Sequence, residues 1–442
     1  MKNQKTNPFI LATGLVICLI TAVVLWNYVD QSHQKQIICQ QDAIGIWGPV
    51  TLSFTETANK ASIETRIKIE PEVDGTWKRA EGSLTFLPSR PLNDLIIYHI
   101  SVDGEDQNSR EPLCELKVRK PKILYQSVLM GQGKIFIRDP DEDNPILLVQ
   151  FDGSILDYQA AWDGSGVAAS VKNKTGGSDI WTVSRDGKTK KILVVCGKDE
   201  CDTPAWFPDS RRIVFSRRGK IKNNEISTRI WLVDLMTGQA QPLMADKTIS
   251  GINPQISPDG QNIAFYDPGR QGIWIIRESG RGEMQFLQTN TAMFAWSPDS
   301  KDLLYFNGGT DLTNYLMNIY LYHLDNQKAD ILLNEYKEQF EFGKPVWSVD
   351  GKWILMNIRY AQGSPGRKLI ILSPDGAQSR IIADKQVEIY SSYLWNPDGQ
   401  SIIYQKMEWG SSTVKPMILE KDLTSDAVKV LVEEGSMPEW LP

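Results

Sequence analysis

The residues best suited to chemistry form a basic cluster within one short stretch of the chain. Its members are Arg217, Arg218, Lys220 and Lys222. Aromatic side chains follow further along, at Tyr315, Phe340, Tyr360, Tyr390 and Trp409. Positive groups beside aromatic rings suit binding of an acidic peptide, a polysaccharide or another protein subunit, because Tyr, Trp and Arg often dominate interfaces. The alternative is that the charges are only solvated and several rings fill the core.

Motifs for catalysis, phosphate binding or metal binding are missing from the sequence. It has no G-x-S-x-G nucleophile turn and no G-x-x-x-x-G-K-[ST] phosphate loop. The acidic run at 139–144 resembles a calcium loop only faintly, since Asn144 and Gln150 stand where Gly and Glu are needed. With three histidines in the chain, a His-based metal centre is not expected. We therefore expect no metal, no cofactor and no enzymatic activity.

The net charge of −6 argues against a nucleic-acid partner. A general nucleic-acid binder normally carries a basic surface. We expect no nucleic-acid partner.

One short sequence motif, called the repeated phrase below, recurs along the chain. The fold that it predicts must position these side chains. Its centres are spaced 40 to 51 residues apart, at Trp162, Trp206, Ile256, Trp296, Trp347, Trp395 and Trp440. A Pro-Asp turn and an apolar run usually follow each centre, then a third and a short fourth strand. A period of this length with four strands per repeat is typical of a β-propeller.

The two ends of the repeat region are expected to close the ring. The piece that begins at Pro121 has only three strands, and the missing inner strand is predicted at Met437–Pro442. Joining both ends in one blade hides the last open sheet edge. This arrangement predicts seven blades, with six as the alternative.

The repeats resemble a known family. Ala295–Ser300 reads A-W-S-P-D-S, and it is followed by the apolar run Leu303–Phe306. These phrases are similar to the PD40 repeats of TolB-like propellers over residues 121–442. The resemblance implies a fold and no particular ligand, because the repeated residues are structural.

The N-terminal segments predict a membrane anchor. Residues 1–8 carry Lys2 and Lys5, and residues 9–29 contain no charge, which is long enough for a transmembrane helix. The rival interpretation is a cleaved signal peptide, but no small-residue cleavage site follows. Residues 30–43 are polar and predict a stalk. The remaining chain is then expected outside the cytoplasm, at the periplasm or cell surface.

Residues 44–120 predict a small β-sandwich, because several short strands alternate with turns. Gly48-Pro49-Val50, Leu84-Thr85-Phe86 and Tyr98 resemble bacterial Ig-like domains of the SbsA type. That resemblance implies a spacer without chemistry of its own.

The cysteines support an oxidising compartment. Outside the apolar span there are four, which suggests two disulfides. Cys39 and Cys114 bracket the sandwich, and Cys196 and Cys201 lie five residues apart. The alternatives are reduced thiols or a metal clip.

The long loops of the propeller predict the face that binds. In a four-stranded blade, the loops after the second and fourth strands share one face, and here these are the long, variable ones. They are Ser216–Thr228, Asn307–Met317, Arg359–Lys368, Lys406–Lys415, Gly197–Thr203, Asn334–Lys344 and Lys385–Ser392. Long loops on a rigid scaffold commonly carry binding residues.

Two classes of function follow from this pattern. The first is a membrane-anchored binding or scaffold protein whose loop face engages a protein or cell-envelope partner. The alternative is a propeller-type enzyme, or a protein that binds or processes a polysaccharide, acting at the funnel. The sequence favours the first, because the loops carry aromatic, amide and basic residues rather than clustered acids and histidines.

A protease test checks the predicted topology. Because the single charge-free span follows Lys2 and Lys5, residues 30–442 should be digested when protease is added to spheroplasts. Digestion is followed by immunoblotting of the propeller, with a cytoplasmic protein as the control for lysis. Protection of the propeller until the cells are lysed would reverse the orientation.

Overall fold

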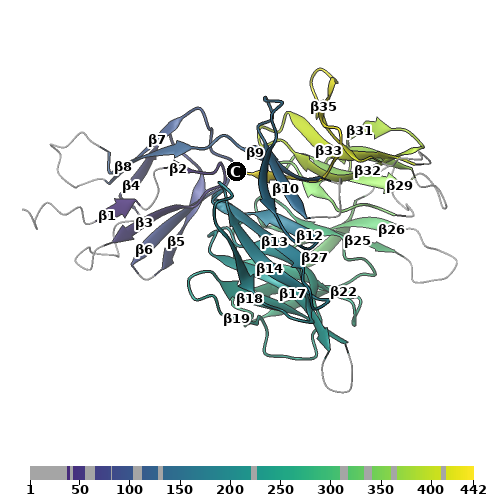
Figure 1. Ribbon diagram of the computed structural model, residues 1–442, viewed down its shortest axis with the longest axis horizontal. Helices are drawn as coiled ribbons and strands as arrows, with labels where there is room; N and C mark the ends of the chain where they lie inside the picture. The colour runs from purple at the N-terminus through teal and green to yellow at the C-terminus, as the bar shows by residue number, and fades with distance from the viewer. Residues whose placement is uncertain are drawn as a thin grey trace, which may run out of the picture.

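A computed structural model describes most of the chain outside its N-terminal segment (Figure 1). The described residues are 37–39, 43–54, 65–80, 82–102, 112–127, 133–220, 226–308, 317–332, 341–359, 366–409 and 415–442. Their regular elements are all strands. Within these ranges no helix is long and apolar enough to cross a membrane. The predicted anchor at 9–29 lies outside the described residues.

Two four-stranded sheets form the N-terminal part. One has the order β1 (Ile37–Cys39), β3 (Val50–Phe54), β6 (Ser83–Pro88) and β5 (Gly75–Ala80). The other has the order β2 (Ala43–Ile44), β8 (Cys114–Val118), β7 (Ile97–Val102) and β4 (Ile67–Glu70). Leu52, Phe86 and Ile100 are buried in one shared core. We call this part the sandwich.

Both predicted disulfides are confirmed. Cys39 and Cys114 join β1 to β8 and so link the two sheets of the sandwich. Cys196 and Cys201 close a short loop in the propeller. Disulfides form and persist in oxidising compartments, so they point to an extracellular or periplasmic location.

The remaining strands pair into seven four-stranded units, counted over the part of the chain that the structure describes. The first is β36 (Gly435–Leu441), β9 (Lys122–Ser127), β10 (Lys134–Arg138) and β11 (Ile146–Gln150). The second and third are β12 (Ile155–Ala160), β13 (Gly166–Lys172), β14 (Ser178–Ser184) and β15 (Lys190–Val194), then β16 (Glu200–Trp206), β17 (Arg212–Lys220), β18 (Ile226–Asp234) and β19 (Ala240–Pro242). A single bridge between Ser178 and Glu200 joins these two units.

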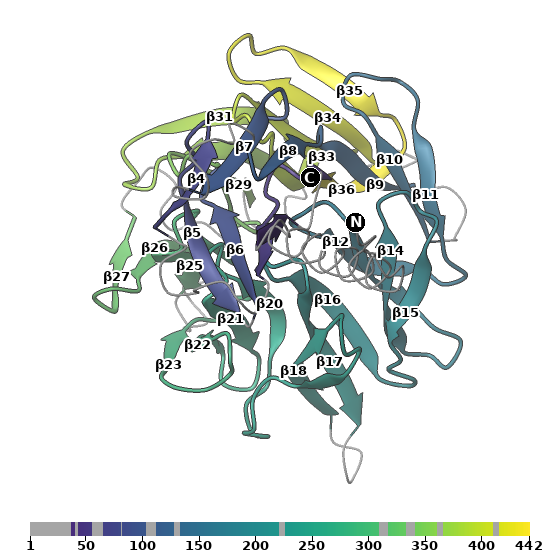
Figure 2. The same ribbon diagram turned by 90° about the vertical axis from the view of Figure 1, so that its left-hand side faces the viewer.

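Four further units complete the ring (Figure 2). The fourth and fifth are β20 (Ile252–Ile256), β21 (Asn262–Asp267), β22 (Gly272–Arg277) and β23 (Met284–Gln288), then β24 (Phe294–Trp296), β25 (Asp302–Gly308), β26 (Met317–His323) and β27 (Lys328–Ile331). The sixth and seventh are β28 (Val346–Trp347), β29 (Ile354–Arg359), β30 (Arg367–Leu372) and β31 (Ser379–Asp384), then β32 (Glu388–Trp395), β33 (Ser401–Glu408), β34 (Met417–Asp422) and β35 (Val428–Val432). This is the all-β propeller expected from the repeats.

The repeated phrase works as the sequence suggested. In one copy the Ser297 hydroxyl donates to Asp299 at 2.7 Å, and it accepts the Asp302 N–H at 2.9 Å. Ser300 takes the left-handed φ of 65° that Gly adopts in sister copies. The preceding Trp296 donates its indole N–H to the Gln255 carbonyl of the fourth blade, the neighbour on the N-terminal side, at 3.2 Å. The phrase therefore closes a turn and ties two blades together.

The sandwich lies against the face that carries these tight turns (Figure 1). The Gly45 N–H donates to the Asp163 carbonyl at 2.8 Å. Trp47 packs edge-on against Trp162, with ring centroids 6.2 Å apart. A Cβ on Gly45 would lie only 2.8 Å from Pro442, so the junction admits little beyond glycine. The long-loop face is therefore the one opposite the sandwich.

Three predicted loops are shorter than expected. β17 and β18 continue as paired strands through Lys220 and from Ile226, inside the predicted loop at 216–228. β16 begins at Glu200 and β32 at Glu388, each inside a predicted loop. The backbone groups of these segments pair in the sheet, because an extended partner strand lies beside them.

Removal of the last strand tests ring closure. β36 pairs with β9, Leu441 is 0% exposed, and Trp440 donates to the Trp395 carbonyl at 2.8 Å. Deletion of Met437–Pro442 should lower the melting temperature strongly and promote aggregation, because it exposes the β9 edge. Trp440→Ala alone should cost roughly 3 kcal/mol of unfolding free energy.

The matched control is Trp409→Ala, since that side chain is 62% exposed. It should leave the melting temperature nearly unchanged in a calorimetric scan. Equal melting of the deletion variant and the intact chain would show that the ring does not depend on this strand.

Candidate functional site

The structure describes only part of the predicted binding set on the loop face. Lys222, Tyr315, Phe340 and Tyr360 lie outside the described residues. Trp409 is exposed at the end of its hairpin, and Lys220 is exposed at the end of β17. These two side chains are accessible to a partner.

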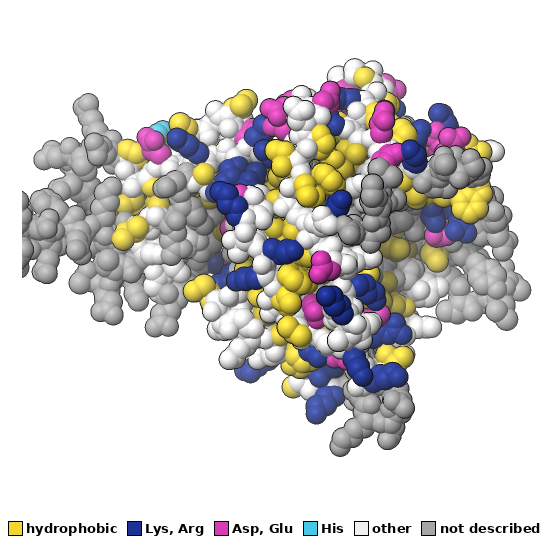
Figure 3. Space-filling view, viewed as in Figure 1, with side chains coloured by type: hydrophobic (Ala, Val, Ile, Leu, Met, Phe, Trp, Pro, Cys, Tyr) yellow, Lys and Arg dark blue, Asp and Glu magenta, His cyan; other side chains and the backbone are white. Residues whose placement is uncertain are grey.

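Arg217 and Arg218 are already paired with acids. Nη2 of Arg217 lies 2.8 Å from Oδ2 of Asp199, and its guanidinium stacks 4.7 Å from the Trp231 ring. Arg218 lies 3.6 Å from Glu200. Over the face shown in Figure 3, basic and acidic side chains are interspersed. The cluster is therefore less positive than its sequence suggested.

The placement of Tyr390 in a binding loop is wrong. It lies within β32 and is only 2% exposed. Its hydroxyl donates to Oε2 of Glu388 at 2.5 Å, and burial raises the pKa of the phenol. The ring fills the core of its blade, which was the alternative considered for these aromatics.

A different group of residues meets at the ring axis. Six inner strands (β12, β20, β24, β28, β32 and β36) and the segment before β28 line a cavity of about 520 Å³. Its charged lining residues are Asp157, Lys344 and Glu439. Its aromatic lining residues include the partly exposed Trp47 and Trp347, and the buried Tyr158, Trp296 and Tyr393. We call this space the axial cavity.

Irregularities in the inner strands accompany this lining. The pairing of β36 with β9 shifts register between Ser436 and Glu439, and Met437 between them has a φ of 54°. The pairing of β32 with β33 also shifts register, and Ser392 has a φ of 45°. A bulge re-aims the side chains that follow it, and such bulges are common beside active sites. Here Met437 and Glu439 both line the cavity.

The two carboxyl groups of the axial cavity titrate close to neutrality. Burial raises the pKa of Glu439 to about 7, with Lys344 opposing the shift and Asp157 adding to it. Burial likewise raises the pKa of Asp157 to about 6, against the effect of Lys344. Protein surrounds both groups, while their side chains stay partly open to the cavity. Carboxyls with pKa values in this range can exchange protons at physiological pH.

Hydrogen bonds hold the segment that carries Lys344. The Tyr393 hydroxyl donates to the Lys344 carbonyl at 2.7 Å, and the same oxygen accepts the Asn357 N–H at 3.1 Å. The Gly343 N–H donates to the Asn357 carbonyl at 2.9 Å. Glu341 pairs with Arg359 at 2.7 Å. The lysine is therefore anchored through its backbone, which fixes where its side chain starts.

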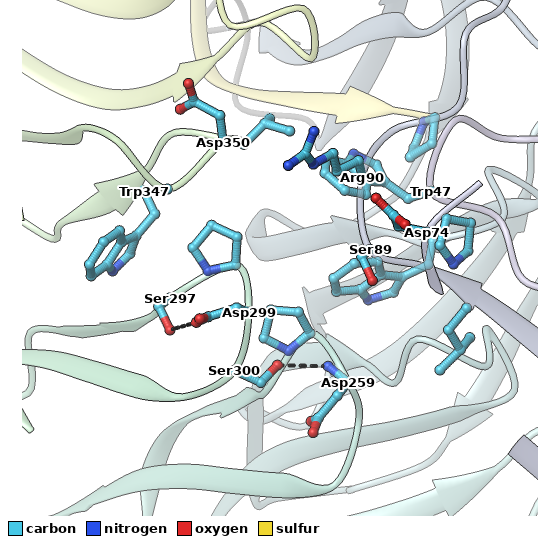
Figure 4. Close-up of a pocket in the computed structure, with 18 of the residues that line it drawn as sticks. Trp47, Asp74, Ser89, Arg90, Asp259, Ser297, Asp299, Ser300, Trp347 and Asp350 are labelled. Carbon is cyan, nitrogen blue, oxygen red and sulfur yellow. Dashed lines mark hydrogen bonds between the residues drawn. The ribbon is translucent and has the colours of Figure 1, made fainter. Parts of the chain in front are cut away.

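A second and larger cavity, of about 760 Å³, lies between the sandwich and the turn face (Figure 4). The sandwich contributes Trp47, Asp74, Ser89 and Arg90. We call this space the cleft. Trp47, Trp347 and Glu439 line both the cleft and the axial cavity, so the two spaces adjoin.

Metal binding has no obvious site here. Among the described residues no group of three or more His, Cys, Asp or Glu side chains could hold a metal ion. The groups that line the axial cavity can transfer protons and form hydrogen bonds.

Sequence reasoning missed Asp157 and Glu439 because it searched the long loops. Glu439 stands directly before Trp440, and Asp157 stands shortly before Trp162. Their positions beside the repeated motif were visible in the sequence, but no local pattern showed that they share a cavity.

Comparisons with known proteins show the fold. No protein-family profile matches the sequence, and no curated protein matches it. Among solved structures, an oligogalacturonate lyase in complex with manganese aligns with a TM-score of 0.53 and 14% identity, over 69% of this chain and 91% of that one. Puromycin hydrolase aligns with a TM-score of 0.54 and 14% identity, over 72% of this chain and 52% of that one.

TolB from Acinetobacter baumannii aligns with a TM-score of 0.46 and 16% identity. The alignment covers 73% of this chain and 66% of TolB, so the chain spans a little less than two thirds of TolB's length. At 14% identity, the likenesses to the lyase and to puromycin hydrolase show the propeller fold alone.

The comparisons also correct one expectation. We expected no enzyme, because the long loops lack clustered acids and histidines, and the enzymes among the structural neighbours contradict that expectation. The composition of the loops does not decide this, since inner strands can bring acids together at the axis. The chain shares the propeller fold with proteins that include a lyase and a hydrolase.

Proposed function

We propose that the axial cavity is an acid–base catalytic site that cleaves a hydroxyl-rich ligand of the saccharide class. The observation that carries the proposal is the meeting of Asp157 and Glu439 in one cavity, with pKa values of about 6 and about 7. Between these values one carboxyl is mostly ionised and the other mostly protonated. Burial raises both pKa values, and the higher value at Glu439 makes it the acid and Asp157 the base.

The two carboxyls divide the work of hydrolysis. Glu439, which holds its proton to the higher pH, donates it to the oxygen of the breaking glycosidic bond. Asp157 accepts a proton from the water whose oxygen bonds to the sugar carbon. Glycoside hydrolysis commonly uses such a pair. Lys344 opposes the rise in the pKa of Asp157 and so helps to keep the base ionised.

The lining of the axial cavity supports a neutral ligand rather than an anion. Two carboxyls and one ammonium group leave no excess of positive charge. Carboxylates accept hydrogen bonds from hydroxyl groups, and aromatic rings offer apolar surface to a ligand. By its name, the structurally similar lyase acts on oligogalacturonate. That substrate is a saccharide, as proposed here, but it differs in charge from the neutral ligand that the cavity lining favours.

The membrane anchor, the domain organisation and the partner face that the sequence predicts remain proposals. Residues 9–29 would anchor the chain, 44–120 would form an Ig-like domain, and 121–442 would form the propeller. The loop face would meet an envelope or protein partner through exposed residues such as Lys220 and Trp409. The long-loop face lies opposite the sandwich, so such a partner would not compete with it.

Activity should show a bell-shaped dependence on pH. The active form needs an ionised Asp157 and a protonated Glu439, so the rate should fall below about pH 6 and above about pH 7. Asp157→Asn and Glu439→Gln should each lower kcat by roughly 10²- to 10⁴-fold. The measurement is release of reducing ends from a panel of neutral oligosaccharides.

Asp152→Asn is the matched control, because that side chain is exposed outside the axial cavity. It should retain full activity. Turnover that survives both cavity substitutions would move the reaction elsewhere. Release of unsaturated products instead would mean elimination rather than hydrolysis.

Stability should reveal the raised pKa of Glu439 without any substrate. The folded pKa of about 7 lies above the ordinary value of 4.5, so the folded state holds a proton that the unfolded state releases. Stability from this group is therefore present below pH 4.5 and is lost as pH rises towards 7. Glu439→Gln stays neutral and should be more stable than the unaltered chain by about 3 kcal/mol at pH 8.

The two proteins should be equally stable near pH 4.5, as measured by urea unfolding. Exposed Glu433 provides the control, and Glu433→Gln should give no such pH-dependent gain. A Glu439→Gln difference that is constant between pH 4.5 and 8 would contradict the raised pKa.

A further inference from the structure

The cleft between sandwich and propeller has not been given a role in the reaction proposed above, although Glu439 lines it. Its walls come from two separate parts of the chain. Trp47 and Arg90 of the sandwich face Trp347 and Asp350 of the propeller across an open space (Figure 4). A volume of about 760 Å³ lies within the range of small-molecule binding sites.

Contacts beside the cleft support its walls. The Gly45–Asp163 hydrogen bond and the Trp47–Trp162 contact join the sandwich to the second blade. Lys78 reaches the turn of the fourth blade, where its Nζ lies 3.0 Å from the position of a Cβ on Gly260. Contacts with the second and the fourth blade therefore hold the sandwich in place beside the cleft.

Trp347 differs from its counterparts in the repeated phrase. The other five tryptophans donate their indole N–H to carbonyls of neighbouring blades: Trp162, Trp206, Trp296, Trp395 and Trp440. The Nε1 of Trp347 is buried and has no hydrogen-bond partner among the described residues. A buried donor without a partner costs free energy. Trp347 lines both cavities.

The lining of the cleft combines aromatic rings, one arginine and six acidic side chains, whose carboxylates accept hydrogen bonds from hydroxyl groups: Asp74, Asp259, Asp299, Asp302, Asp350 and Glu439. Trp47, Trp162, Trp347 and Trp440 all contribute to it. Arg90, Ser89 and Asp74 add hydrogen-bonding groups from the sandwich. Rings beside scattered polar groups suit a sugar, which has apolar C–H faces and a rim of hydroxyls.

We propose that the cleft is a second subsite, which binds the continuation of an oligosaccharide whose reacting bond lies in the axial cavity. The proposal rests on the function proposed above and names its substrate as an extended chain. Glu439 lines both spaces, so a ligand that fills both would pass the catalytic acid. The sandwich is then part of the binding site as well as a spacer.

The test compares oligosaccharides of different lengths. The full chain carrying Glu439→Gln, which prevents turnover, is purified in a detergent without a sugar headgroup. Calorimetry measures binding of neutral glucose and N-acetylglucosamine oligomers of two and six sugars. The six-sugar form should bind at least about tenfold more tightly, equivalent to about 1.4 kcal/mol.

Two substitutions in the cleft separate its contribution from that of the axial cavity. Arg90→Ala removes a donor, and Ser89→Leu fills space with a group that cannot bind hydroxyls. Each should remove most of the advantage of the six-sugar ligand and leave the two-sugar affinity within about twofold. The matched control is Arg79→Ala, at an exposed position on β5 outside the cleft, and it should change neither affinity.

The outcomes distinguish this inference from the proposed function. Equal affinity for both lengths, or cleft variants that keep the full advantage, overturns the second subsite and leaves the axial site standing. No binding of either length overturns the proposed function and the subsite with it.

Discussion

The pairing of the last strand with the first is the interaction on which the rest of the structure depends. β36 hydrogen-bonds to β9, and through this pairing the chain closes its ring. The same strand carries Glu439 into the axial cavity. Its end at Pro442 lies against Gly45 of the sandwich. Ring closure, the axial cavity and the contact between sandwich and propeller therefore all depend on β36.

The proposed site uses a property that a propeller core would otherwise avoid. Burying a carboxyl disfavours its ionised form, so Asp157 and Glu439 are unfavourable as structural residues. Hydrophobic inner strands would pack more stably. Acids kept at such a place are a signature of function, because active sites commonly sacrifice stability for chemistry.

Under the proposed function, the sandwich has a larger role than that of a tether. Its docking covers the tight-turn face and supplies Trp47 and Arg90 to the cleft. The long-loop face is left on the other side of the ring. One propeller can thus present a covered site at one end and an open surface at the other.

The sequence by itself determined the propeller, the pairing of Cys39 with Cys114 and of Cys196 with Cys201, and the return of the final strand to the first blade. These features follow from local repeats and from the spacing of cysteines. Only the tertiary structure decided that Tyr390 is buried, that Arg217 pairs with Asp199, and that the inner strands carry the candidate site. Asp157 and Glu439 come from opposite ends of the repeat region. They share a cavity because the ring closes and its inner strands converge on one axis, and no local pattern encodes that convergence.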